Sequence, residues 1–426
     1  MNKWLTAGAV LLCLPSAARP AALDLPWQGS LRGYGDLGVV WTDEYAGWLD
    51  EGVGKGRYGS HSPSHRQLRV VAPEASLIHE LVIGASLTGT FQIKYDDEQY
   101  HLLDIAEAWL QYRSPPSPGL RWRLKVGTFL PPISLENNGI GWTSPYTLTS
   151  SALNSWVGEE LRTNGAELRL LFTHGETDID LYGSVYFAND AAGTLMHWRG
   201  WTIHDRELTL FDEAPLPEFQ YELINPVGPF RYQEEYYRPL DEIDGRAGFY
   251  AGMDVDNENW GRVSLHYYDN NVNADAKVDD YGQYPWVVRF AVLGYRGEVL
   301  ERLTFITQLM AGNTKAGRRL QPSNKRAGDV DFFAAYGLLS RDFGRWRVAA
   351  RYDYYETRDK DPIRWRYNNE EDGFAVTTTA QYKLYERVRL ALELQYLDHG
   401  RPVRKYDDVP THIDEFTLRG NLRWFF

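Results

Sequence analysis

The C-terminal stretch Phe416-Thr417-Leu418-Arg419-Gly420-Asn421-Leu422-Arg423-Trp424-Phe425-Phe426 decides the fold. Side chains of a β-strand point alternately to its two faces. Here every second residue is apolar or glycine, and most of the residues between them are polar or cationic. A strand with one apolar and one ionic face is typical of a wall that separates lipid from water.

The same alternation recurs toward the N-terminus. Leu390, Leu392 and Leu394 share one face of a predicted strand, and Arg389 and Glu393 share the other. A soluble β-sandwich also alternates, so a single strand does not decide between the two folds. The repetition of the pattern, with no segments left over to form a separate core, favours a membrane barrel. We expect further strands of this kind at 81–95, 120–129, 345–355 and 387–397.

Composition agrees with a barrel and excludes a membrane helix. After residue 22 no apolar run approaches the roughly 20 residues that a membrane-spanning helix needs. Mean hydropathy is −0.47. Aromatic residues nevertheless make up 14% of the 426 residues, including 15 Trp and 28 Tyr, and these rings favour membrane–water interfaces. The net charge of −13 disfavours nucleic acid as a partner.

The N-terminus is typical of a secretory signal peptide. Lys3 is followed by the apolar stretch 4–14 and by the small residues of 15–18. We expect residues 1–22 to be the signal peptide and residues 23–426 to form a single barrel domain. The only cysteine, Cys13, lies in this segment, so we expect neither disulfides nor thiol chemistry in the mature chain.

Connections of two lengths separate the expected strands. Eight long loops imply an all-β, transmembrane antiparallel barrel of about sixteen strands in the bacterial outer membrane, with long extracellular loops and both termini in the periplasm. The segment 66–80 is the weakest strand because Pro73 interrupts it. Short turns are expected near 78–80, 115–119, 174–177, 258–260, 297–301, 342–345 and 385–387. Long loops are expected near 43–64, 96–102, 131–162, 191–246, 271–284, 314–328, 358–372 and 400–412.

Two stretches resemble known outer-membrane proteins. The C-terminus resembles the terminal signature that the barrel-assembly machinery recognises, which implies this partner through Trp424 and Phe426. The stretch 125–136, Lys-Val-Gly-Thr-Phe-Leu-Pro-Pro-Ile-Ser-Leu-Glu, is similar to a passage of porins related to the phosphate-selective group. The resemblance implies passive diffusion of small hydrophilic solutes, an in-folded third loop at 131–162 that forms the constriction, and a homotrimer. A dense lysine cluster, which a phosphate channel would carry, is absent from the sequence.

Charged residues on the inward faces are the candidate pore lining. Arg121, Arg123 and Lys125 form a ladder without an intervening acid, which would attract small anions. Alternatively, acids on neighbouring strands, such as Glu107 and Glu167, pair with these bases and brace the wall. The expected pore-lining residues are Arg121, Arg123, Lys125, Glu107, Glu167, Arg169, Arg347 and Arg351.

The third long loop combines amides, aromatics and charges that suit a sugar or another polar solute. Alternatively, the same residues pin the loop to the inner wall, which we favour for Trp142 and Trp156. The candidate constriction residues are Glu136, Asn137, Asn138, Trp142, Tyr146, Asn154, Glu159, Glu160 and Arg162.

The fourth long loop, 191–246, is strongly acidic. Eleven acids and three bases between 205 and 244 give a charge of about −8. Its many aromatics argue against disorder, so we expect a cap over or into the mouth. Its carboxylates have two interpretations. They form a divalent-cation site, which would bridge loops or bridge lipopolysaccharide, or they form a solvated acidic surface.

No residue pattern indicates an enzyme. Ser264 and His266 share a predicted inward face without further support, and no histidines show metal-ligand spacing. We therefore expect no catalysis, no cofactor and no bound metal, and membrane lipid and lipopolysaccharide as surroundings. The alternative function is a surface binding or adhesion scaffold that uses the large acidic loop.

Overall fold

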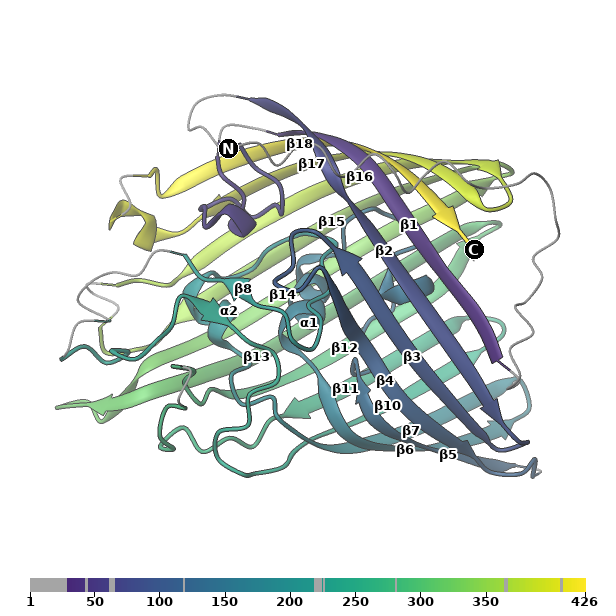
Figure 1. Cartoon of the computed structure of the whole chain (residues 1–426), viewed down its shortest axis with the longest axis horizontal. Coiled ribbons are helices and arrows are strands. Elements are labelled where there is room, and N and C mark those ends of the chain that lie inside the picture. The colour runs from purple at the N-terminus through teal and green to yellow at the C-terminus, as the bar shows by residue number, and fades with distance from the viewer. Residues whose placement is uncertain are drawn as a thin grey trace.

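The computed structural model describes residues 29–42, 45–60, 66–117, 119–217, 224, 227–279, 282–363, 367–406 and 409–426. Sixteen antiparallel strands close into one barrel (Figure 1), which confirms the predicted fold. The predicted signal peptide lies outside the described residues. The barrel strands are β1 (Gly29–Thr42), β2 (Gln67–Ile83), β3 (Leu87–Asp96), β4 (Leu103–Arg113), β5 (Leu120–Phe129), β6 (Thr163–His174), β7 (Thr177–Phe187), β10 (Gly248–Asn257), β11 (Gly261–Asp269), β12 (Val287–Leu300), β13 (Leu303–Leu320), β14 (Lys325–Phe343), β15 (Trp346–Asp359), β16 (Glu371–Tyr385), β17 (Val388–Gly400) and β18 (His412–Phe425).

Short elements occupy the loops. Among the described residues, none of the helices is both long enough and apolar enough to cross a membrane. The elements are the 3-10 helices η1 (Trp48–Asp50), η2 (Ile140–Trp142) and η3 (Pro402–Tyr406), the α-helices α1 (Ala152–Glu160) and α2 (Thr194–Trp198), and a two-stranded sheet of β8 (Ala214–Pro215) and β9 (Tyr236–Tyr237).

The first and last strands close the ring. β1 pairs with β18 from Tyr34 opposite Phe425 to Trp41 opposite Leu418. The terminal residue completes the ladder, because Gly33 and Phe426 exchange both backbone N–H···O bonds at 3.1 Å. A side chain at position 33 would start 2.5 Å from the Phe426 ring. Glycine is therefore required at this closing contact.

Alternation sorts side chains between an apolar outside and a polar inside. Leu390, Leu392 and Leu394 face outward and are 39%, 55% and 39% exposed, whereas Glu393 and Gln395 between them are buried in the lumen. Trp122, Leu124 and Val126 of β5 are likewise exposed on the outside. An apolar outer face around a closed ring of strands is the architecture of an outer-membrane barrel.

Two predicted boundaries are wrong. The expected strand 81–95 is divided by a turn at 84–86, where Gly84 has a φ of +73°, so no turn occurs at 78–80. β2 continues through Pro73 because a register shift opposite 36–38 creates a bulge there. The expected long loop 314–328 is mostly strand, since β13 and β14 run on to a turn at 321–324.

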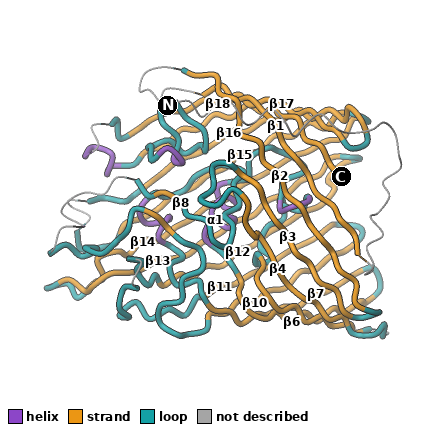
Figure 2. Tube along the Cα trace, viewed as in Figure 1, coloured by secondary structure: helices purple, strands orange, loops and turns teal. Residues whose placement is uncertain are grey.

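The described parts of three loops fold into the barrel: loop 1 (45–60), loop 3 (130–162) and loop 4 (188–217 and 227–247). Figure 2 shows α1 of loop 3 within the ring of strands. Every residue of α1 is buried. In loop 4, α2 and Trp201 are buried as well. The long acidic loop therefore enters the mouth, one of the two arrangements expected for it.

Candidate constriction and its charge network

Loop 3 positions α1 through a network of hydrogen bonds. Ser151 is the N-cap residue, and its hydroxyl accepts the backbone N–H of Asn154 at 3.3 Å. The Glu136 carboxylate accepts the N–H of Ser151 at 2.7 Å and the side-chain amide of Asn154 at 2.8 Å. These contacts satisfy N–H groups that the first turn of a helix leaves unpaired. They fix α1 across the lumen.

Arg351 of β15 fastens this loop to the wall. Its guanidinium pairs with Asp353 at 2.7 Å and with Glu136 at 3.4 Å, and it donates to the carbonyls of Thr149 and Ser150. Its side chain is fully buried. The structure thus places Arg351 as a brace between wall and loop, away from water.

Glu393 of β17 holds the neighbouring turn of loop 3. Its carboxylate accepts the backbone N–H groups of Leu148 and Thr149 at 2.5 and 3.0 Å. The hydroxyl of Thr379 donates to it at 2.7 Å. Loop 3 is therefore anchored on β15 and β17, at positions that the sequence alone does not connect.

The other side of the lumen is apolar. Trp156 of α1 packs edge-on against Phe290 at 5.4 Å and lies 5.3 Å from Phe332, and Trp201 of loop 4 lies 5.9 Å from Phe332. Tyr182, Tyr186, Tyr250, Tyr268 and Met310 belong to the same buried cluster. The inward face of β7 and β10–β14 thus forms a hydrophobic core with loops 3 and 4.

Loops 1 and 4 meet through buried charges. Arg57 of loop 1 contacts Glu74, Asp96, Glu98 and Asp205 at 2.8 to 3.2 Å. Arg419 of β18 holds the other oxygen of Asp205 at 2.5 Å. Burial raises the pKa of Asp205, but Arg419 and Arg57 outweigh it and hold the pKa well below its ordinary value. This carboxylate is therefore ionised and tied to two parts of the chain.

The seam between loops 1 and 4 is nearly closed. Gly56 and Ile203 form a parallel backbone bridge. A cavity of about 20 Å³ lies beside it, lined by Arg57, His204 and Arg419 among others, which is room for about one water molecule. Around Trp48, Arg199 and Arg206 have buried N–H groups without hydrogen-bond partners among the described residues. Buried polar atoms of this kind usually bind water.

The predicted basic ladder lies on the lumen face of β5. Arg123 is directly opposite Arg113 of β4 and Arg169 of β6 in the strand register. Like charges directly opposite each other destabilise a sheet. Within the described chain, neither Arg121 nor Arg123 forms an ion pair, whereas Lys125 lies 3.6 Å from Glu167.

The other predicted lining residues are paired. Arg169 contacts Glu167 and Asp180, both at 2.8 Å. Glu107 accepts the N–H of Leu130 at 2.8 Å. Arg347 pairs with Asp342 at 2.8 Å and donates to the carbonyl of Pro145 in loop 3. Both alternatives for the wall charges thus occur, bracing for these residues and unpaired cations for Arg121 and Arg123.

The loop 3 candidates divide by environment. Asn137 donates to the Trp142 carbonyl and the Ser150 hydroxyl, Asn138 is exposed, and Tyr146 is buried with Arg347 5.5 Å from its ring. Trp142 packs partly buried against the core. These contacts pin the loop.

The acids at the end of α1 bind loop 4. Glu159 pairs with Arg199 and lies 3.2 Å from His204. Glu160 accepts the indole N–H of Trp156 and the N–H of Leu195. Burial raises the pKa of Glu160 to about 7. Arg162 lies 3.8 Å from Glu207.

Sequence reasoning missed Arg57 and Asp205, which join loop 1 to loop 4. The acidity of loop 4 was visible, but its partners Arg57 and Arg419 are distant in sequence. Glu207 and Asp212 are buried, Asp205 is largely buried, and all three are paired, so this part of the loop is not a solvated surface.

One group of carboxylates could hold a cation. Oxygens of Asp190, Glu242 and Asp244 lie within 4.8 Å of one another. Asp190 already accepts the N–H groups of Ile243 and Asp244, at 2.7 and 3.1 Å. Both bonds use the same oxygen of Asp190 and organise the base of loop 4.

Comparison with known proteins supports the fold. No protein-family model and no curated protein matches the sequence. The outer membrane channel DcaP of Acinetobacter baumannii superposes with a TM-score of 0.57 at 11% identity, over 93% of this chain and 97% of that chain. This chain has the fold of an outer-membrane channel. The anion-selective porin from Comamonas acidovorans gives a TM-score of 0.49 at 12% identity over 93% and 99% of the two chains.

Proposed function

We propose that this chain is an outer-membrane channel for small hydrophilic solutes with a preference for anions. The observation that carries the proposal is that Arg121 and Arg123, which form no ion pair among the described residues, lie on the lumen face of a closed barrel, with Arg123 directly opposite Arg113 and Arg169. Cations without partners in a confined passage attract anions and repel cations. Phosphate selectivity in particular has no support in the residues of this lumen.

We infer that a solute passes the outer half of the lumen when the in-folded loops move. Loops 1, 3 and 4 fill it, and the seam between loops 1 and 4 holds a cavity of about 20 Å³. Where the loops meet the inward face of β7 and β10–β14, α1 and Trp201 pack against aromatic rings. Moving the loops away from these rings would expose a large apolar surface. On the seam side, Arg199 and Arg206 lie over the Trp48 ring and have buried N–H groups that find no partner within the described parts of the chain. We infer that the route opens along the seam.

Below loop 3 the proposed route enters a basic vestibule. A cavity of about 460 Å³ is lined by one acid, Asp342, and by five bases: Arg302, Arg345, Arg347, Lys383 and Arg389. Within the described residues, Arg389 has no acidic partner and packs 4.8 Å over the Phe425 ring. This cavity adds positive potential on the periplasmic side of loop 3. Assembly as a homotrimer and contact with the barrel-assembly machinery stay predictions from the sequence.

Planar-bilayer recording tests this function. The purified protein should give discrete conductance steps, and in a potassium chloride gradient the reversal potential should have the sign of chloride selectivity. Because the structure is closed at the seam, the Asp205→Asn variant is recorded in parallel as an opened form. Cation selectivity, or silence of both proteins at all voltages, would contradict the proposal. A liposome-swelling panel of sugars, amino acids and organic acids would then rank the solutes.

A further inference from the structure

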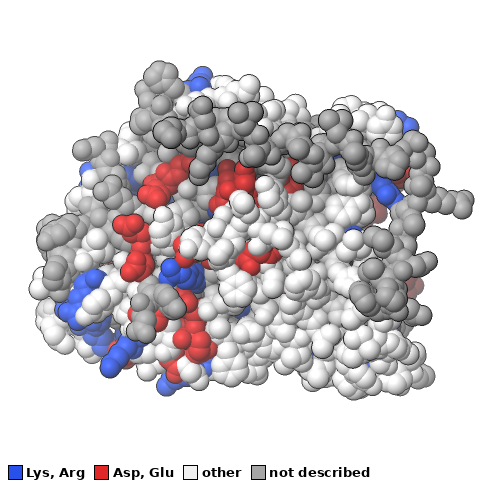
Figure 3. All heavy atoms as spheres, in the orientation of Figure 1, with Lys and Arg blue, Asp and Glu red and all other residues white. Residues whose placement is uncertain are grey.

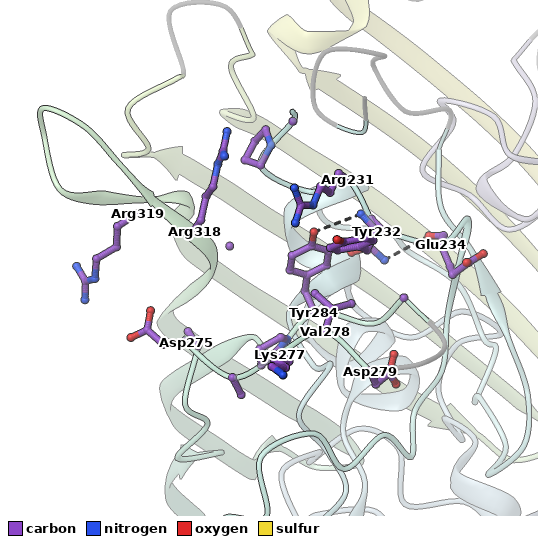
Figure 4. Close-up of a pocket in the computed structure, with 18 residues that line it drawn as sticks. Arg231, Tyr232, Glu234, Asp275, Lys277, Val278, Asp279, Tyr284, Arg318 and Arg319 are labelled. Atoms are coloured by element: carbon purple, nitrogen blue, oxygen red, sulfur yellow. Dashed lines mark hydrogen bonds between the residues drawn. The ribbon is translucent and has the colours of Figure 1, made fainter. Parts of the chain in front are cut away.

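A second site lies outside the lumen, at the extracellular end of the barrel. A pocket of about 990 Å³ opens between loop 4, loop 5 (270–286) and the β13–β14 hairpin (Figure 4). Pockets that bind small organic molecules have volumes of about 300 to 1,000 Å³. We propose that this pocket binds a phosphate-bearing saccharide. Residues that would contact it are Arg231, Tyr232, Lys277, Tyr284, Arg318 and Arg319.

Tyr284 forms the floor of the pocket and belongs to a packed aromatic cluster that lies beneath it. Phe230 stacks on Trp286 with ring centroids 5.8 Å apart and contacts Tyr284 at 5.2 Å. The Tyr284 hydroxyl accepts the backbone N–H of Tyr232 at 3.3 Å. Tyr232 stands above this floor and is 54% exposed. Burying the apolar face of a sugar ring against this exposed ring is favourable.

Two glycines bring the walls close to the floor. Gly317 of the hairpin has a φ of +76°, and a Cβ there would lie 3.0 Å from the Phe230 ring. Gly282 of loop 5 has a φ of +75°, and a Cβ there would lie 2.4 Å from the Tyr232 carbonyl oxygen. Both positions favour glycine through conformation and space. The pocket is therefore preformed by close contacts between three separate segments.

The pocket concentrates cations in an acidic protein. Arg318 donates to the carbonyl of Val227 at 2.7 Å, and Arg319 donates to the carbonyl of Asn324 at 3.0 Å. A guanidinium has five N–H donors, so most donors of both side chains are not used by these bonds. Planar guanidinium groups bind phosphate with paired hydrogen bonds. Figure 3 shows Lys and Arg side chains gathered at this end of the molecule, beside a band of Asp and Glu.

Two of the three acidic residues that line the pocket, Glu234 and Asp279, lie away from Arg318 and Arg319. In Figure 4, Arg318 and Arg319 are on the left with Asp275 beside them, while Glu234 is on the right and Asp279 is below. Asp275 is neutralised by Arg326 at 2.9 Å. Carboxylates accept hydrogen bonds from hydroxyl groups. An anionic group would bind the free donors of Arg318 and Arg319, and a sugar hydroxyl would donate to Glu234, which favours a phosphorylated sugar over bare phosphate.

Calorimetric titration of the full chain in detergent micelles tests the proposal. The probes are a phosphorylated core oligosaccharide and the same oligosaccharide after removal of its phosphates. We expect the phosphorylated form to bind at least tenfold more tightly, and Arg318→Ala/Arg319→Ala to abolish that difference. Lys325→Ala/Arg358→Ala removes equal charge from the same rim outside the pocket lining and should change affinity less than twofold. Tyr232→Ala should weaken both probes.

Rough lipopolysaccharide bearing the same core distinguishes the source of the ligand. If the phosphorylated oligosaccharide and lipopolysaccharide both bind, the saccharide suffices as the ligand. If only lipopolysaccharide binds, the membrane lipid is the ligand. Either result supports the site, provided that the arginine variant abolishes the binding. Binding of neither, equal binding of the dephosphorylated probe, or wild-type affinity in the arginine variant would overturn it. Heat-modifiable migration in gels verifies folding. Channel conductance should be unchanged in the variant, which separates this site from the proposed transport.

Discussion

Arg57 of loop 1 and Asp205 of loop 4 form an ion pair, 3.2 Å apart, inside the barrel. Their side chains are only 2% and 11% exposed, and Arg419 of the last strand holds the same carboxylate from the wall. Removing one member of a buried ion pair typically costs about 3–5 kcal/mol, because the remaining charge loses its partner. This contact therefore connects loop 1 to loop 4 through a largely buried ion pair.

Asp205→Asn should increase channel opening. The substitution keeps the shape of the side chain but leaves Arg57 and Arg419 with one acid fewer, so loops 1 and 4 separate more readily. In bilayer recordings we expect a severalfold rise in open probability. Asp275→Asn, which removes an exposed carboxylate from loop 5, is the control and should behave like wild type. Unchanged gating in Asp205→Asn would show that this ion pair does not hold the channel closed.

Arg121→Ala/Arg123→Ala should shift ion selectivity toward cations. These side chains face the lumen without ion-pair partners in the described chain, so their loss removes positive potential from the proposed route. The reversal potential in a salt gradient measures the shift. Arg341→Ala lies on the outward face of β14 near the same rim and should leave the potential unaltered. Equal potentials for all three proteins would refute the assignment of this ladder to the solute path.

Glu160→Gln should remove a pH-dependent part of the stability. Burial raises the pKa of Glu160 from its ordinary 4.5 to about 7, so the folded protein keeps this proton over a range where the unfolded chain has lost it. The contribution is complete below about pH 4.5 and falls as the pH rises to 7, by about 3 kcal/mol in total. The Glu160→Gln variant has no carboxyl proton at this position, so its stability lacks this fall between pH 4.5 and pH 7.

Guanidinium denaturation at pH 5 and pH 7, followed by tryptophan fluorescence, measures that difference. Relative to wild type, Glu160→Gln should become more stable at pH 7 than at pH 5. Glu235→Gln, an exposed acid of loop 4, serves as control with no such trend. Other titrating groups act alike in all three proteins, so a pH-independent difference between Glu160→Gln and wild type would contradict the expectation.

A disulfide across the seam should lock the channel. Gly56 and Ile203 are bridge partners, at a spacing of about 5 Å that a disulfide spans. The chain's one cysteine is Cys13, in the predicted signal peptide, so Gly56→Cys/Ile203→Cys adds an isolated pair. The oxidised protein should conduct in fewer and shorter openings than after reduction with dithiothreitol. The two single-cysteine variants should not respond to the reductant, and an oxidised double variant that conducts normally would exclude opening at this seam.

Much of the wall could be predicted from alternation because each strand has only two faces. The pattern in β17 and β18 placed Leu390 and Arg419 on the correct sides. It failed at Gly84, since apolar residues continue on both sides of a tight turn and resemble one long strand. Alternation also failed at 314–328, which was predicted as a loop because its residues are polar. There β13 and β14 extend beyond the membrane, where a strand can be polar on both faces.

The interior was less predictable because the in-folded loops determine which inward-facing side chains are exposed to water. Arg351 was expected to line the pore, and its lumen face was identified, but loop 3 covers it through Glu136 and the Thr149 carbonyl. The partners of Asp205 lie on loop 1 and on the last strand, and no local spacing connects them. Alternation therefore predicts the direction of a side chain and not its neighbours.

The backbone exchange between Gly33 and Phe426 has a consequence for biogenesis. β1 and β18 pair although all the other barrel strands lie between them in the sequence. A sheet in which this contact has not formed presents two unpaired edges, which are prone to aggregation. Closure between β1 and β18 is therefore the step of assembly that removes both edges at once.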